Sequence, residues 1–179
     1  MKAARIALAV LLVSIYSTLA VIRRVTNALR DAGHLKTVVG IAFGLAALAV
    51  IALLIRTPAL RKPKTLLLVA ASAGLYALVV WPMESPEEKL HFIEYGTVGV
   101  LWFLSLPVLW STRKKYVCAA LATVASGWLD EGIQALIPSR YYDLRDVGFN
   151  ALAGLMALTL FTVARALAAP GPVVAAPPT

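Results

Sequence analysis

Long apolar stretches alternate with short polar ones along the whole chain, and six of the apolar stretches are about as long as a membrane span. A helix needs roughly 20 apolar residues to cross a bilayer. The apolar residues run continuously instead of alternating, as the strands of a membrane barrel would require. The pattern predicts an all-α, polytopic integral membrane helical bundle with about six transmembrane helices, at Ala3–Ile22, Thr37–Ile55, Thr65–Val80, Leu90–Trp110, Tyr116–Ile137 and Asp146–Ala168.

The composition agrees with this pattern. Of 179 residues, 60% are hydrophobic and 15% are charged, and the mean hydropathy is +0.81. A soluble domain is nearer half apolar and about a quarter charged. The net charge of +8 is spread over the connections, so it indicates membrane topology and not nucleic-acid binding. Cys118 is the single cysteine, which excludes a disulfide framework.

Local signals mark where several of these helices begin and end. Ser85, Pro86 and Glu88 stand in the order of a capping box before the fourth helix. Pro138 ends the fifth helix, and Asp143 is a candidate N-cap for the sixth. We expect three parts: an N-terminal transmembrane hairpin (1–64), a four-helix membrane domain (65–169) and a disordered tail (170–179).

Lysine and arginine in short loops predict the orientation. The basic runs at 56–64 and 113–115 fall on one side, which indicates that the N- and C-termini are cytoplasmic. The basic residues between 23 and 36 would then lie outside; an interfacial helix bound to lipid phosphates is the alternative explanation. The first segment also resembles a signal peptide, and we favour an uncleaved span.

Two polar clusters interrupt the apolar runs, and both are expected at the outer membrane face. Ionisable groups at membrane depth cost roughly 2.5–3.5 kcal/mol each, so they usually have a function. The spacing i, i+3, i+4 gives His91, Glu94 and Tyr95 one helical face. The second cluster has similar helical spacing and consists of Glu131, Gln134, Arg140, Asp143, Asp146 and Asn150.

We predict catalytic or proton-handling roles for His91, Glu94, Glu131 and Asp146. The predicted ligand-binding residues are Lys89, Tyr95, Gln134, Arg140, Asp143 and Asn150. Each has a structural alternative: a Glu131–Arg140 ion pair, helix capping by Asp143 and Asp146, and an interhelical hydrogen bond from Asn150. Asp130 projects about 100° from Glu131 on a helix and is expected to face the interface, away from this cluster. No zinc-type spacing is present, and we predict no metal and no cofactor.

These motifs resemble the VanZ-like family. One signature is Lys89-Leu90-His91-Phe92-Ile93-Glu94-Tyr95-Gly96. The other begins Gly127-x-x-x-Glu131-x-x-Gln134 and continues Pro138-x-Arg140-x-x-Asp143-x-x-Asp146-x-x-x-Asn150-x-x-x-Gly154. The resemblance covers about residues 65–169; the acidic Asp143, and Glu94 between the histidine and the tyrosine, depart from the family pattern.

The resemblance implies a small protein of the bacterial inner membrane, in a family named for a protein linked to low-level resistance to the glycopeptide teicoplanin. The expected partners are membrane lipids, a lipid-linked envelope precursor or a glycopeptide-related ligand. Three functions stay open: binding or handling of lipid head groups, a hydrolase or transferase acting on them, and a scaffold without chemistry. The sequence does not indicate an oligomeric state.

Overall fold

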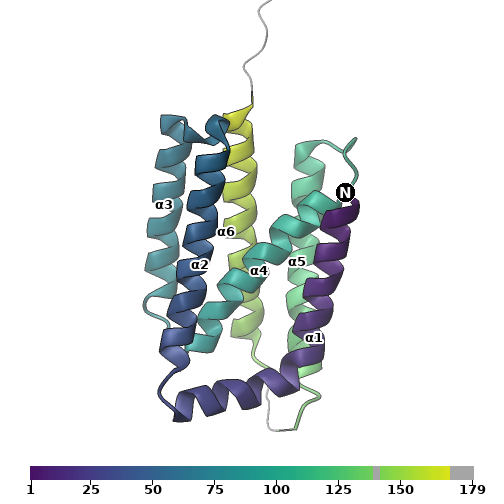
Figure 1. The fold of residues 1–179 in the computed structure, drawn as a ribbon. Helices are drawn as coiled ribbons and strands as arrows, with labels where there is room; N and C mark the ends of the chain where they lie inside the picture. Colours follow the sequence, from purple (N-terminus) through teal and green to yellow (C-terminus); the bar gives the residue numbers. More distant parts are fainter. Residues whose placement is uncertain (139–141, 170–179) are drawn as a thin grey trace, which may run out of the picture.

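The computed structural model describes residues 1–138 and 142–169, and within them the chain is all-helical, as predicted (Figure 1). Four helices are long and apolar enough to cross a membrane: α1, α2, α3 and α6. The prediction of about six spans is therefore supported only for these four. Charged side chains interrupt the other two helices: Glu88, Lys89 and Glu94 on α4, and Asp130 and Glu131 on α5. The helices are α1 (Lys2–Asp31), α2 (Leu35–Arg56), α3 (Pro63–Val80), α4 (Pro86–Ser105), α5 (Thr112–Gln134) and α6 (Leu144–Ala168), with a 3₁₀ turn η1 (Pro58–Arg61).

Helix α1 is longer than predicted and bends near its middle. Its 30 residues would measure about 45 Å if straight, more than the roughly 30 Å of a hydrocarbon core. The Ser17 hydroxyl donates to the Val13 carbonyl and the Thr18 hydroxyl to the Ser14 carbonyl, each at 2.6 Å, and such back-bonding bends helices. Figure 1 shows the second half of α1 running crosswise to the first. The basic residues 23–30 thus belong to a helix and not to a loop.

Capping side chains mark the starts of α4 and α6. Ser85 accepts from the Glu88 amide and Asp143 from the Arg145 amide, so both predicted N-caps are confirmed. The predicted end of the fourth helix at Trp110 is wrong. Helix α4 ends at Ser105 because Leu106, which precedes a proline, is extended.

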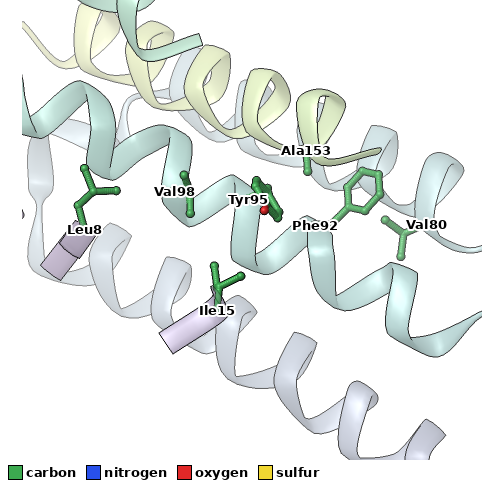
Figure 2. Packing of buried hydrophobic residues seen from close by; sticks show 7 residues of the cluster. All are labelled: Leu8, Ile15, Val80, Phe92, Tyr95, Val98 and Ala153. Atoms are coloured by element: carbon green, nitrogen blue, oxygen red, sulfur yellow. The ribbon is translucent and has the colours of Figure 1, made fainter. Parts of the chain in front are cut away.

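Helix α4 occupies the centre of the bundle and packs against α6 above all, then against α1, α5 and α2. Figure 2 shows its buried residues Phe92, Tyr95 and Val98 between Leu8 and Ile15 of α1 on one side and Ala153 of α6 on the other. The structure therefore encloses the middle of α4 on several sides, and polar groups there have only protein neighbours to pair with.

Glycines allow α4, α5 and α6 to approach closely. A Cβ atom on Gly99 would lie 3.0 Å from the Gly154 carbonyl oxygen, and one on Gly127 would lie 2.9 Å from the Asn150 Cβ. A Cβ on Gly154 would clash with the Thr123 methyl group. Small residues at such contacts are what lets membrane helices pack backbone to backbone.

Charge is divided between the two ends of the bundle. The helix ends that meet at one end, which we call the basic end, carry ten lysines and arginines and none of the nine acidic residues. The ten are Lys2, Arg5, Arg56, Arg61, Lys62, Lys64, Arg113, Lys114, Lys115 and Arg165. All nine acidic residues belong to the half of the bundle toward the opposite end, which we call the acidic end.

We expect the acidic end to face outward, because cations are retained on the cytoplasmic side. In a Cys118→Ala background, Glu84→Cys should react with a membrane-impermeant maleimide in intact cells. Arg61→Cys should react only after the cells are permeabilised. The reverse pattern of labelling would contradict this orientation.

The close contact of α6 with α5 and α4 predicts that Gly154→Ala is destabilising, by about 1–3 kcal/mol. The Thr123 side chain cannot easily rotate away, because its hydroxyl donates to the Ala119 carbonyl at 2.8 Å. Gly148→Ala on the same helix is the matched control, since a Cβ there meets nothing within 4 Å. Thermal unfolding in detergent should lower the melting temperature of Gly154→Ala alone; equal melting temperatures would contradict the tight packing.

Candidate functional site at the acidic end

Five polar side chains from α4, α5 and α6 are buried together toward the acidic end. They are at most 3% exposed and comprise Tyr95, Asp130, Glu131, Gln134 and Asn150. The glycine contact between Gly127 and Asn150 brings α6 against the face of α5 that also carries Asp130 and Gln134. Two carboxyl groups and two amides thus lie inside a helical bundle, where an unpaired polar group is costly.

Tyr95 and Asp130 are joined by a buried hydrogen bond. The Tyr95 hydroxyl donates to Asp130 Oδ2 at 2.9 Å and lies 3.4 Å from the Ser126 carbonyl oxygen. That same carbonyl accepts from the Tyr16 hydroxyl at 3.0 Å, and the Trp102 indole N–H donates to the Ser126 hydroxyl at 3.2 Å. One turn of α5 therefore holds side chains from α1 and α4.

The expectation that Asp130 faces the interface is wrong: its side chain is fully buried. The 100° rotation from Glu131 is real, but it points Asp130 toward α4 instead of toward lipid. The helical spacing of the sequence could have predicted that Asp130 is buried. Gly127, Asp130 and Gln134 recur at i, i+3, i+7, so Asp130 shares a face with a predicted site residue.

Several polar atoms of this cluster have no hydrogen-bond partner within the described part of the chain. They are Asp130 Oδ1, Glu131 Oε1, Gln134 Nε2, His91 Nδ1 and both side-chain polar atoms of Asn150. Leaving a buried donor or acceptor unpaired costs about 1–3 kcal/mol. Such a concentration in three helices is unusual for groups that serve packing alone.

His91 and Glu94 lie between the buried cluster and the surface. The His91 Nδ1 atom is 3.8 Å from Glu94 Oε2, which is beyond hydrogen-bond distance, and their side chains are 17% and 41% exposed. The His91 ring centroid is 6.1 Å from that of Tyr95. Glu131 lies within electrostatic range of His91, Asp130 and Asp146. The predicted group of His91, Glu131 and Asp146 is therefore brought to one region.

The start of α6 closes this region. Glu131 Oε2 accepts from the Asp143 backbone amide at 3.4 Å, linking the end of α5 to the cap of α6. Asp143 itself caps α6, and Asp146 stands in its first turn. Both acidic groups lie at a helix N-terminus, where the helix dipole favours negative charge.

An open hollow of about 610 Å³ lies beside these helix starts, and we call it the α3–α4 hollow. Its lining combines apolar and charged side chains: Val79, Pro82, Met83, Glu84, Ser85, Glu88, Arg145 and Phe149. Arg145 Nη2 lies 3.9 Å from Glu88 Oε1 across it. Burial, with smaller effects from the charges of Asp146 and Asp143, raises the pKa of Glu88, although Arg145 and His91 act in the opposite direction.

Residues of this hollow were missed at the sequence level, because Glu88 and Arg145 read only as helix-end charges. Among the predicted ligand-binding residues, Lys89 is half-buried near the start of α4, whereas Tyr95, Gln134 and Asn150 are inside the bundle. Arg140 lies outside the described residues. In the described ranges, no group of three His, Cys, Asp or Glu side chains is placed to hold a metal ion.

Comparison with family models, curated proteins and solved structures finds no match for this chain. The likeness to the VanZ-like family therefore depends on the motif residues alone.

The Tyr95–Asp130 bond predicts strong coupling between the two positions. Asp130→Ala should lower the free energy of unfolding by about 1–3 kcal/mol, because it leaves the buried Tyr95 hydroxyl with only the Ser126 carbonyl oxygen, at 3.4 Å, as an acceptor. In a double-mutant cycle with Tyr95→Phe, the second substitution should cost much less than it does alone. Asp31→Ala, at an exposed acidic position, is the control and should leave unfolding in detergent unchanged. Additive losses at Tyr95 and Asp130 would argue against the bond.

Proposed function

We propose that this chain is a multi-pass protein of the bacterial inner membrane, of the VanZ-like kind. Its acidic end faces outward and binds a polar or anionic head group, of a membrane lipid or of a lipid-linked envelope precursor. The observation that carries the proposal is the α3–α4 hollow, whose lining is apolar on one part and charged on another. A lipid presents the same combination, an apolar chain joined to a polar head.

Each part of the lining has a role in this proposal. Arg145, 69% exposed, offers a planar guanidinium to a phosphate or carboxylate oxygen. Glu88 orients the guanidinium and would release it when an anionic ligand competes. Val79, Met83 and Phe149 supply the apolar wall against which the first carbons of the ligand would pack.

The buried cluster behind the hollow serves the same ligand indirectly. The imidazole of His91 lies close to the carboxyl groups of Glu94 and Glu131, and these side-chain types can act as proton donors and acceptors. These groups can take up or release a proton as an anionic head group arrives. Tyr95 and Asp130 position the helices that carry them and are not expected to touch the ligand.

An enzyme acting on the head group is the second candidate, favoured by His91 with Glu94 at 3.8 Å. That pair would act as general acid or base. If it does so, His91→Gln should abolish turnover of the head group without weakening its binding. If the chain only binds the lipid, neither the unsubstituted protein nor the His91→Gln variant should change the lipid chemically.

The proposal can be tested with a photoactivatable phosphatidylglycerol that carries its diazirine near the head group. In vesicles of phosphatidylcholine containing this probe, adducts should map to peptides with Met83 and Phe149. Arg145→Gln should reduce their yield about ten-fold, as expected for loss of a charge-assisted hydrogen bond of roughly 1.5 kcal/mol or more.

Arg24→Gln is the matched control, since Arg24 is an exposed arginine of α1 outside the lining of the hollow. It should leave the adducts at Met83 and Phe149 unchanged. Equal reduction by both substitutions would mean that general attraction, and not a site, brings the lipid there.

A further inference from the structure

Three cations from three helices gather around the last turn of α4 at the basic end. The Lys115 Nζ atom lies 4.4 Å from the centroid of the Phe103 ring, and the Arg165 Cζ atom lies 5.9 Å from the same centroid. Arg165 is also 5.7 Å from the Phe161 ring. Arg5 Nε donates to the Ser105 carbonyl oxygen at 3.0 Å. The positive charges of Lys115 and Arg165 thus both lie near the Phe103 ring. Arg5 binds the backbone of α4 two residues further on, at Ser105.

Lys115 is the unusual member of this group, because it is only 9% exposed. Lysine is rarely this buried unless it is paired. Among the described residues, no carboxylate and no hydrogen-bond acceptor pairs with its ammonium group, and the nine acidic residues all lie toward the other end. Burial, and secondarily the Arg165 charge, lower the pKa of Lys115. The site therefore has an excess of positive charge that the described residues do not neutralise.

Helix dipoles do not supply the missing negative charge. A helix C-terminus is equivalent to about −0.5 elementary charge and an N-terminus to about +0.5. Near this cluster the C-termini of α4 and α6 are opposed by the N-termini of α1 and α5. The four partial charges sum to about zero, against three whole positive charges. Contact with the Phe103 ring contributes roughly 1 kcal/mol for an exposed cation, which does not replace a counter-ion.

We propose that Lys115 and Arg165, with Arg5 beside them, bind the phosphate of an anionic phospholipid in the leaflet at the basic end. The inference rests on the membrane insertion proposed above, which puts this end at the depth of the lipid head groups. It concerns a different site from the α3–α4 hollow and a different leaflet. Basic side chains between helices on the cytoplasmic side are suited to anionic head groups.

The experiment titrates phosphatidylglycerol into the full-length protein in zwitterionic detergent, and native mass spectrometry counts the bound lipid. We expect saturable binding of phosphatidylglycerol and much weaker binding of phosphatidylcholine. Lys115→Gln should weaken phosphatidylglycerol binding about five-fold, from roughly 1 kcal/mol for each cation near a phosphate. Arg165→Gln should act in the same direction, and Lys115→Arg should retain most of the affinity.

Lys114→Gln is the matched control. It removes the same charge one residue away, where the exposed Lys114 lies over the Trp110 ring and not over Phe103. Equal weakening by Lys114→Gln and Lys115→Gln, or equal binding of the two lipids, would overturn the site. Displacement of the lipid by millimolar inorganic phosphate would assign the site to a free anion and overturn the lipid assignment.

Two further measurements distinguish failure of the lipid site from misfolding of a variant and from failure of the proposed membrane insertion. The melting temperature of each variant without lipid shows whether it is folded; if Lys115→Gln is unfolded, Arg165→Gln and Lys115→Arg decide the matter. Extraction of the protein from cell membranes by alkaline carbonate would contradict membrane insertion, and with it the proposed function. Retention in the membrane together with unselective lipid binding would overturn this inference alone.

Discussion

The contact of α4 with α5 and α6 is the constraint on which the rest of the structure depends. Glycines at three positions bring these helices together, and Thr123, held by its own back-bond, fills the space beside Gly154. In lipid, helices gain little from excluding water, so close packing and interhelical hydrogen bonds must stabilise the bundle. The Tyr95–Asp130 bond lies at this contact. The close approach of α4, α5 and α6 that permits this packing also buries the polar side chains between them.

That enclosure divides the polar residues of the acidic end into two kinds. Asp130, through its Oδ2 atom, and Tyr95 are hydrogen-bonded to each other and hold α4 and α5 together. Within the described residues, Glu131, Gln134 and Asn150 each keep at least one unpaired polar atom inside the bundle, where an apolar side chain would cost less. Such groups, beside the mostly buried His91 and an open hollow, are better explained by a site than by packing. The proposed head-group binding gives those groups a task that folding alone does not.

Much of the fold could be predicted from the sequence, because length and continuous hydrophobicity determine membrane helices and because caps such as Ser85 and Asp143 act locally. The errors came from effects that hydrophobicity does not report. Pro107 shortens α4, and back-bonding by Ser17 and Thr18 bends a helix that is too long to cross straight.

The grouping of His91, Glu131 and Asp146 was predictable because all three lie near helix ends that topology brings together. The role of Asp130 was not, since it depends on which side of α5 receives α4. The α3–α4 hollow depends on how α3, α4 and α6 are placed against one another, which periodicity within one helix does not determine.

The two ends of the bundle pose opposite electrostatic problems. At the acidic end, the carboxyl groups of Glu88, Glu131 and Asp146 lie near one another, and Arg145 beside Glu88 is the cation that the proposed head group would bind. At the basic end, no carboxylate of the described residues pairs with Lys115, whose side chain is largely buried. The segregation of charge on which the expected orientation rests therefore also leaves an excess of positive charge among the described residues where α4, α5 and α6 converge. Because the helix dipoles cancel there, the described residues leave this charge uncompensated, and the proposed source of compensation is an anionic phospholipid in the leaflet at the basic end.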